Sequence, residues 1–325
     1  MRKITYAQAI NEAFHQLMAS DENVILIGQG VTSPWYVGST ADGLIDKFSE
    51  KRVIDTPISE NGITGIAAGA SLYGIKPIIV HPRMDFMYYA MDQIANHIAN
   101  WYYMFGGQFS MPLIIWGIIN RGGEQAAQHS QAIHALFMHI PGLKVIAPST
   151  AYDVKGLLIA ACKDKNPVLF IDDRWLYQTT DFVPKKMYNI PIGKAKIRKK
   201  GKDITIVSSS YMSTEVLKAA FILEEKAISA EVIDLRSLKP IDKNTIFSSV
   251  KKTKRLVIVD GGWKTCGAAS EISAIVAEQM LKELTTPIKR ITLPDLPAPA
   301  SCNLEKKYYN DSNTIAKEIQ NIMEG

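Results

Sequence analysis

Residues 52–74 read RVIDTPISENGITGIAAGASLYG and set the pattern for the first half of the chain. A short apolar strand at 53–54 leads through a turn at 55–57 to Ser59, which occupies the position of a helix N-cap. The helix that follows consists mostly of glycine, alanine and isoleucine, so it can pack closely against a sheet. Glu60 falls in its first turn. That carboxylate is either an ordinary acid favoured by the helix dipole or a functional group carried by an apolar helix.

The composition excludes several classes of protein. The length of 325 residues predicts two domains, and the net charge of +5 is concentrated in two lysine-rich runs at 194–202 and 251–255. We interpret these runs as solvated surface and expect no nucleic-acid partner. The cysteines and histidines have no disulfide or zinc-ligand spacing. No signal peptide or membrane-spanning apolar run is found, so we expect a cytoplasmic protein with no membrane partner.

Apolar strands alternate with helical segments along both halves of the chain, which predicts an α/β fold with a doubly wound parallel sheet in each domain. We place the first domain at 1–175, a linker rich in proline, lysine and tyrosine at 176–203, and the second domain at 204–325. The first half is expected to contain strands at 24–27, 53–54, 76–80, 112–117, 144–146 and 168–171, and helices at 5–19, 41–49, 85–103, from 130 onwards and at 151–162.

Motifs that bind phosphate are absent from the sequence. It has no GDG with a following Asn-Asn pair for a magnesium diphosphate, no Walker motif, and no GxGxxG that opens a helix after a strand. Functional groups instead gather where strands of the first domain end, at Glu60, in HPRMDF (81–86) and in AAQHSQ (126–131). His129 is either a proton shuttle or a structural histidine. We interpret His134 and His139 as structural.

Several longer motifs carry a family resemblance. RVIDTPISENGITGIAAGAS, AMDQIANHIA, YYMFGGQ, AAQHSQ and PGLKVIAPSTAYDVKGLL resemble the beta subunit of the thiamine-diphosphate-dependent, decarboxylating component of 2-oxo acid dehydrogenases, as do KDITIVSSS and VIDLRSLKPID later in the chain. The resemblance covers nearly the whole chain. It implies a pyrimidine-binding domain of the transketolase type followed by a transketolase C-terminal-like domain. It also implies an enzyme subunit that is active only with an alpha subunit.

The resemblance also implies roles for particular residues. A glutamate at the position of Glu60 shares a proton with the aminopyrimidine of thiamine diphosphate and so activates the cofactor, which then attacks a 2-oxo acid such as pyruvate. Phe86 matches the aromatic that packs on the pyrimidine, and Ile58 lines the same pocket. His129 matches a histidine placed near the substrate or the lipoyl group of an acyltransferase partner. The alpha subunit would hold magnesium and the diphosphate, in a heterotetramer of two alpha and two beta subunits.

A potassium site is a further implication of the resemblance. Beta subunits of this family often hold potassium with main-chain oxygens and one acid, and the matching positions here are Leu113, Ala161, Asp164 and Asn166. The alternative interpretation is a helix end capped by Asp-Lys-Asn before a strand.

Departures from the family pattern cluster around the expected cofactor pocket. Gln29 stands where the family usually carries an acid, and His81 and Arg83 add basic groups before Phe86. Arg83 could bind a carboxylate or phosphate, so we expect His81, Arg83 and His129 to contact the substrate. Two alternatives to acyl transfer onto a lipoyl group remain open: transketolase-like transfer to an acceptor such as a sugar nucleotide, and a scaffold subunit without catalytic activity.

Overall fold

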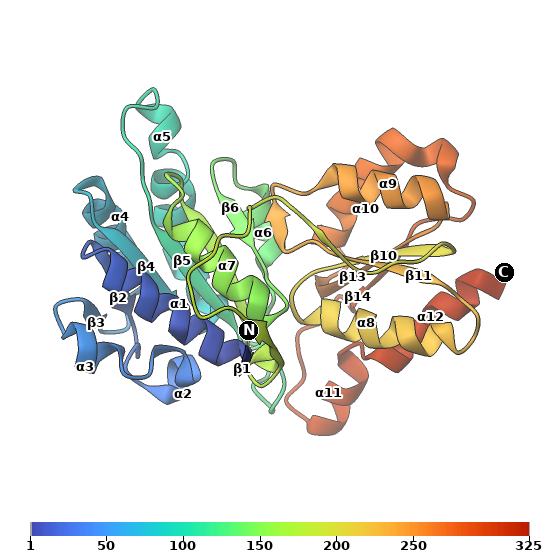
Figure 1. Ribbon diagram of the computed structural model, residues 1–325, viewed down its shortest axis with the longest axis horizontal. Helices are drawn as coiled ribbons and strands as arrows, with labels where there is room; N and C mark the ends of the chain where they lie inside the picture. Colours follow the sequence, from blue (N-terminus) through green and yellow to red (C-terminus); the bar gives the residue numbers. More distant parts are fainter. Residues whose placement is uncertain (1, 325) are drawn as a thin grey trace. The chain divides into compact units, whose positions relative to one another are not determined.

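Parallel β-strands with helices between them form the core of each half of the chain (Figure 1). The computed structural model describes residues 2–324. Its contacts divide the chain into two compact units, one made of residues 1–121 and 136–192 and the other of residues 122–135 and 193–325. The division falls within the short helix α6 (His134–His139).

The first unit is built on a sheet whose strands all run parallel, in the order β6-β7-β5-β4-β2-β3. Strands buried on both faces read as continuous apolar runs, which explains why β5 has no polar residue. A separate antiparallel pair joins β1 (Arg2–Thr5) to β8 (Thr180–Val183). The strands of the main sheet are β2 (Val24–Gly28), β3 (Val53–Asp55), β4 (Lys76–His81), β5 (Ile114–Ile119), β6 (Lys144–Ile146) and β7 (Val168–Asp173).

Two helices of the first unit begin at side-chain caps. Thr5 and Gln8 form a capping box at the start of α1 (Tyr6–Ser20), and Thr150 caps α7 (Ala151–Cys162). Figure 1 shows α1 and α7 side by side. The small residues of α4 (Glu60–Leu72) allow this helix to pack on β4 and β2. The shorter helices are α2 (Pro34–Val37), η1 (Gly38–Ala41), α3 (Leu44–Phe48) and η4 (Arg174–Leu176).

Two helices expected from the sequence differ in the structure. The expected helix over residues 85–103 is instead three short pieces: the 3₁₀ helix η2 (Met84–Ala90), the π-helix η3 (Asp92–Ile98) and α5 (Trp101–Met104). Both η2 and η3 pack against α4, and the amide of Ala99 bonds to the carbonyl of Ile94, a wider turn than that of an α-helix. The helix expected from residue 130 likewise begins only at His134.

The second unit contains a sheet in the order β14-β13-β10-β11-β9, in which only β9 runs antiparallel. Figure 1 shows α9 and α10 on one side of this sheet and α8 and α12 on the other. The strands of this sheet are β9 (Lys196–Lys199), β10 (Ile204–Ser208), β11 (Ala230–Asp234), β13 (Leu256–Trp263) and β14 (Lys289–Leu293). The short strand β12 (Ser237–Lys239) lies in the same unit but not in this sheet. Its helices are α8 (Ser210–Glu224), α9 (Lys243–Thr253), α10 (Ala268–Met280), η5 (Leu281–Glu283), α11 (Cys302–Tyr308) and α12 (Ser312–Glu324).

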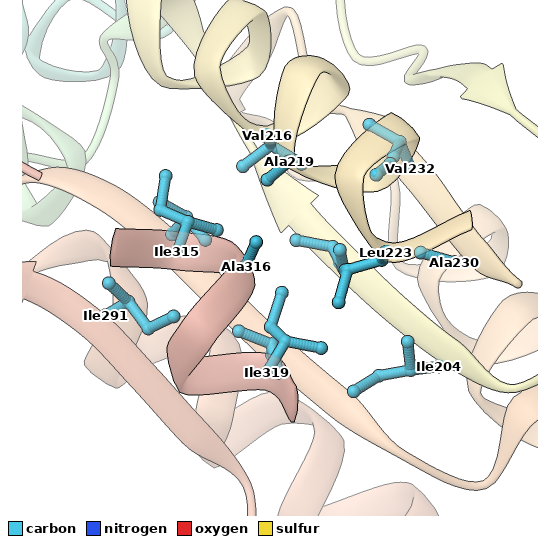
Figure 2. Packing of buried hydrophobic residues seen from close by; sticks show 14 of the residues in the cluster. Ile204, Val216, Ala219, Leu223, Ala230, Val232, Ile291, Ile315, Ala316 and Ile319 are labelled. Atoms are coloured by element: carbon cyan, nitrogen blue, oxygen red, sulfur yellow. The ribbon is translucent and has the colours of Figure 1, made fainter. Parts of the chain in front are cut away.

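The apolar core of the second unit joins α8 and α12 to the sheet. Figure 2 shows Val216 and Leu223 of α8 and Ile319 of α12 directed toward one another above the strand residues Ile204 and Ile291. All five side chains are buried, so the C-terminal helix is an integral part of this fold.

The prediction of two α/β domains with mainly parallel sheets is confirmed. The bounds 1–175 and 204–325 with a linker at 176–203 stay a prediction. Two of the strands described here, β8 and β9, lie within that linker range. Among residues 2–324, no helix is both long and apolar enough to span a membrane.

Candidate functional site

The carboxyl ends of β2, β3 and β4 meet at one edge of the first sheet, where Asp55 fixes the turn that contains Gln29. The Asp55 carboxylate accepts hydrogen bonds from the amide of Gly30 at 2.7 Å and from the hydroxyl of Thr32 at 2.9 Å. Gly28 has φ of +151°, and a Cβ there would lie 2.6 Å from the carbonyl oxygen of Val80. Only glycine therefore lets β2 approach β4 so closely at this turn.

Glu60 lies in the first turn of α4, directly after β3, as the sequence predicts. Ser59 is in the N-cap position, but its side chain makes no capping hydrogen bond. The Thr64 hydroxyl donates to the main-chain oxygen of Glu60 at 2.6 Å. Glu60 is half-buried, and the neighbouring Ile58 side chain is 71% exposed. An acid and an apolar side chain thus stand together at the edge of the sheet, open to a ligand.

His81 ends β4 and is buried, with 1% of its surface exposed. Its Nε2 lies 3.3 Å from the hydroxyl oxygen of Thr64. Because the Thr64 hydrogen is donated to Glu60, this oxygen accepts from His81, which places the imidazole proton on Nε2. Nδ1 has no hydrogen-bond partner among residues 2–324. Burial lowers the pKa of His81 to about 4, so the imidazole is neutral at physiological pH.

Phe86 lies in η2, and η2 packs against α4. This aromatic residue therefore belongs to a segment that contacts the helix carrying Glu60. The amide of Phe86 donates to the carbonyl of Arg83 at 3.2 Å, and the Phe86 side chain is half-buried. Arg83 is only 8% exposed, and its Nη1 donates to the carbonyl of Pro82 at 2.8 Å. Gln29, Ile58, Glu60, His81, Arg83 and Phe86 therefore all belong to the first unit and follow the ends of its strands β2, β3 and β4.

Sequence reasoning missed a second group of residues, which lies at the carboxyl end of β7 and directly after it. Arg174 donates from Nη2 to the carbonyls of Trp35 (2.9 Å) and Tyr36 in α2. Asp172 accepts from the hydroxyl of Tyr177 at 2.7 Å and from the indole of Trp116 at 3.2 Å. Burial raises the pKa of Asp172 to about 7, against the lowering effect of these two hydrogen bonds. The one signal in the sequence was the run Asp-Asp-Arg directly after an apolar strand.

His129 belongs to the second unit, in which residues 122–135 are included, and it is half-buried there. The same stretch contains His134, whose Nε2 lies 2.8 Å from the Asp260 carboxylate of β13. Burial acts to raise the pKa of Asp260, but His134 and the amides of Gly262 and Ala269 outweigh it and lower that pKa. The prediction that His134 is structural agrees with this buried pair. Its partner Asp260 could not be identified from sequence spacing.

The four residues of the expected potassium site lie near the amino ends of β5 and β7 in the first unit. The carbonyl of Leu113 accepts the amide of Val168, and the carbonyl of Ala161 accepts the amides of Lys163 and Asp164. The Asp164 carboxylate accepts from Lys144 Nζ at 2.5 Å and from the amide of Asn166 at 3.0 Å. Carbonyl oxygens suited to a monovalent cation are therefore present, while the charge of Asp164 is already paired with Lys144.

Comparison with known proteins places this geometry in a family. The family models "Transketolase, pyrimidine binding domain" and "Transketolase, C-terminal domain" match residues 2–180 and 193–315. The chain is 42% identical over 319 residues to the acetoin:2,6-dichlorophenolindophenol oxidoreductase subunit beta of Bacillus subtilis, with 94% of this chain and 93% of the relative covered. It is 39% identical over 320 residues to the pyruvate dehydrogenase E1 component subunit beta of Rickettsia felis, with 98% of each covered.

The chain belongs to the family of E1 beta subunits of pyruvate and acetoin dehydrogenases. Thiamine diphosphate is the cofactor that this E1 beta family implies. Among solved structures, a split-gene transketolase, described as an inactive beta4 tetramer, aligns with a TM-score of 0.79 and 22% identity over 98% of both chains. That likeness concerns the fold alone.

The residues at the carboxyl edge fit the aminopyrimidine half of the cofactor of E1 beta subunits. An aminopyrimidine is a flat aromatic ring with polar nitrogens on its rim, and it needs an apolar surface and an acid. Ile58 offers an exposed apolar side chain beside the half-buried carboxylate of Glu60, and Phe86 offers an aromatic face. No GDG motif for the diphosphate occurs in the sequence. These features fit a subunit that contacts one half of the cofactor.

Proposed function

We propose that this E1 beta chain activates thiamine diphosphate through Glu60 for the decarboxylation of a small 2-oxo acid such as pyruvate. The observation that carries the proposal is the position of Glu60, half-buried in the first turn of a helix and next to the exposed Ile58. When bound, the cofactor supplies a carbon nucleophile that attacks the 2-oxo group. Glu60 would hold a proton at a pyrimidine nitrogen, while Ile58, Phe86 and Gln29 would orient the ring.

An alpha subunit would supply the diphosphate and magnesium site, in a complex of two alpha and two beta chains. Large side chains on and beside α4, η2 and α5 support a protein partner, because they are exposed and would be covered in an interface. Tyr73 is 92% exposed and Tyr103 is 89% exposed, and Ile66, Tyr89 and Met104 are exposed as well. Production of the chain alone and together with the alpha subunit, compared by gel filtration, tests this partner. A stable, soluble beta chain on its own would count against it.

The decisive experiment replaces Glu60 with glutamine in the co-produced alpha–beta complex. Loss of a positioned proton-transfer group lowers rates by roughly 10²–10⁴-fold, so we expect carbon dioxide release to fall by that factor while the complex still assembles. Glu50→Gln is the matched control, because Glu50 is an exposed acid of the same unit. Unchanged carbon dioxide release in Glu60→Gln would reject the activation role and favour a scaffold subunit.

The acyl acceptor is a separate question. Transfer to a non-lipoyl acceptor, such as a sugar nucleotide, is the second candidate, and the basic residues His81 and Arg83 beside Phe86 favour it. His129 would contact the substrate or the acceptor in either case. A complete reaction with pyruvate and a lipoyl-bearing acyltransferase, read as NADH formation, would reject the altered acceptor. Carbon dioxide release that depends on a different acceptor would support it.

Potassium is the last component of the proposal. The main-chain oxygens of Leu113 and Ala161, with Asp164 and Asn166, would hold the ion and so brace the amino ends of β5 and β7. The support for this site is that both carbonyls and the Asp164 carboxylate lie near the amino ends of these two strands.

A further inference from the structure

Three arginines follow neighbouring strands of the first sheet. Arg83 comes after β4, Arg121 after β5 and Arg174 after β7, and these strands are adjacent in the order β7-β5-β4. The carboxyl ends of parallel strands lie at one edge, which is where ligands bind in sheets of this type. Arg121 pairs with the Asp173 carboxylate at 2.9 Å, so its charge is matched within the unit. Arg83 and Arg174 differ from it.

Arg83 is buried, yet its Nη1 donates to a neutral acceptor, the carbonyl of Pro82. Its Nε is buried and has no partner among residues 2–324. A guanidinium carries five N–H groups, and a buried cation is costly unless its donors and its charge are satisfied. Arg83 is buried because it directly follows the buried strand β4. That position does not by itself offset the free-energy cost of burying the charge.

Arg174 is half-buried and also meets neutral acceptors. Its Nη2 holds the carbonyls of Trp35 and Tyr36, and its guanidinium lies 5.9 Å from the centre of the Tyr177 ring. Its Nε, like that of Arg83, has no partner in the part of the chain that the structure describes. Arg174 thus fixes α2 at the edge of the sheet, and its charge is met there by neutral main-chain acceptors.

The charged groups around Arg83 do not cancel fully. Burial lowers the pKa of Arg83 and the charge of Arg174 lowers it further, while Asp85, Tyr36 and Tyr177 act in the opposite direction. Asp172 is the other acid near Arg174, and burial raises its pKa to about 7. The raised pKa means that part of this carboxyl is protonated at neutral pH, so Asp172 offsets the charge of Arg174 only in part.

We propose that Arg83 and Arg174 form a binding subsite for an oxyanion, either a phosphoryl group or a second carboxylate, carried by the substrate or the acyl acceptor. Guanidinium groups bind both oxyanions through paired N–H donors. An oxyanion here would offset the repulsion between the two cations. The inference rests on the proposed function in taking this edge of the sheet as the place of reaction.

The oxyanion differs from the carboxylate that leaves as carbon dioxide. That carboxylate loses its charge as the carbon–carbon bond breaks, so a strong ion pair with it would stabilise the ground state more than the transition state. An anion that remains through the reaction gains from such a pair without slowing the chemistry. The subsite therefore selects a substrate or acceptor with an additional anionic group, which pyruvate lacks.

The test measures anion binding to the alpha–beta complex by isothermal titration calorimetry. The complex is first saturated with thiamine diphosphate and magnesium, so that the diphosphate site is filled. Inorganic phosphate and succinate are then titrated separately at constant ionic strength. Arg83→Gln and Arg174→Gln are the test variants, and Arg174, being half-exposed, gives a result even where Arg83→Gln does not fold. Arg236→Gln is the matched control, because Arg236 is also 8% exposed and also donates to main-chain carbonyls, in the second unit.

We expect the wild-type complex to bind at least one of the two anions, and each test variant to bind it about tenfold more weakly or worse, as for a lost charge-assisted hydrogen bond. Arg236→Gln should bind as the wild type does. Preference for phosphate points to a phosphoryl-bearing ligand, and preference for succinate to a second carboxylate. No binding to the wild type, or undiminished binding to the variants, would overturn the subsite. Calorimetry measures anion binding and not turnover. The result for the subsite therefore does not depend on whether Glu60→Gln lowers carbon dioxide release.

Discussion

His81 Nε2 donates to Thr64 Oγ1 across 3.3 Å, and Thr64 in turn donates to the main-chain oxygen of Glu60. This relay ties the end of β4 to the first turn of α4. The orientation of Glu60 therefore depends on a buried histidine two residues before Arg83. Residues that depart from the family pattern in sequence are thus connected to the residue that carries the proposed chemistry.

Thr64→Val breaks both hydrogen bonds of the relay without changing the size of the side chain. It leaves the buried imidazole N–H unpaired, so we expect the free energy of unfolding to fall by about 1–3 kcal/mol, with weaker binding of thiamine diphosphate. Thr40→Val is the control, since Thr40 is also buried but its hydroxyl donates only to the carbonyl of Val37. Urea unfolding and cofactor titration measure the two effects. Equal binding of cofactor by both variants would contradict the role of the relay.

His81 also predicts a pH dependence. The folded pKa of about 4 lies below the ordinary value of 6.5, so below that value the unfolded chain binds a proton that the folded chain rejects. Stability is therefore fully present above pH 6.5 and decreases as the pH falls toward 4. Between about pH 7.5 and about pH 5 the wild type should lose roughly 2 kcal/mol more than His81→Gln, which cannot titrate. Parallel loss in the two proteins, measured by urea unfolding, would argue against a neutral buried imidazole.

Asp172 predicts the opposite trend. Its folded pKa of about 7 lies above the ordinary 3.8, so in this range the folded protein holds a proton that the unfolded chain releases. Stability is lost as the pH rises. From about pH 5 to about pH 8 the wild type should lose roughly 2–3 kcal/mol relative to Asp172→Asn. The exposed Asp46→Asn serves as control, and thermal unfolding at each pH gives the result. A constant difference between wild type and Asp172→Asn would show that the carboxyl is ionised throughout.

Gly28 predicts a steric limit at the turn of Gln29. Gly28→Ala should destabilise the fold by more than about 2 kcal/mol, because the new Cβ would lie 2.6 Å from the Val80 carbonyl. Gly74→Ala separates this contact from backbone strain, since Gly74 has φ of +87° and no atom within 4 Å of its Cβ position. We expect the smaller loss for Gly74→Ala in chemical denaturation. Equal losses would mean that strain alone sets the turn.

The potassium site can be tested by exchange of salts. If the carbonyls of Leu113 and Ala161 hold the ion, the melting temperature should be higher in potassium chloride than in choline chloride of the same concentration, by linkage of binding to folding. Identical melting temperatures would indicate that the Lys144–Asp164 pair is sufficient at this point of the fold.

Local patterns predicted much of this structure because each signal lies within a few residues. The apolar runs gave all the strands of the first sheet to within about two residues, and Ser59 and Glu60 marked the start of α4. The segment 84–104 could not be predicted in this way. Its aromatic residues suit a helix, yet packing of η2 and η3 on the small residues of α4 decides their conformation.

The candidate site was likewise predicted only where its residues lie close together in the sequence. Glu60, His81, Arg83 and Phe86 lie close together in the sequence and were identified there. Arg174 was not, because its position near Arg83 depends on the order of β7, β5 and β4 in the sheet. Asp260 was missed for a similar reason, since 126 residues separate it from His134. Sequence spacing identifies groups on one element or loop, and sheet topology brings the others to them.

The second unit includes residues 122–135, although residues 136–192 of the first unit follow them in the chain. Within that unit the Glu124 amide donates to Glu305 at 3.0 Å, and His134 is paired with Asp260. A gene fragment that ends at residue 192 would carry the His129 loop without the fold to which it is attached. Chimeras between members of this family should therefore exchange the His129 loop and the C-terminal half together, as a single inherited module.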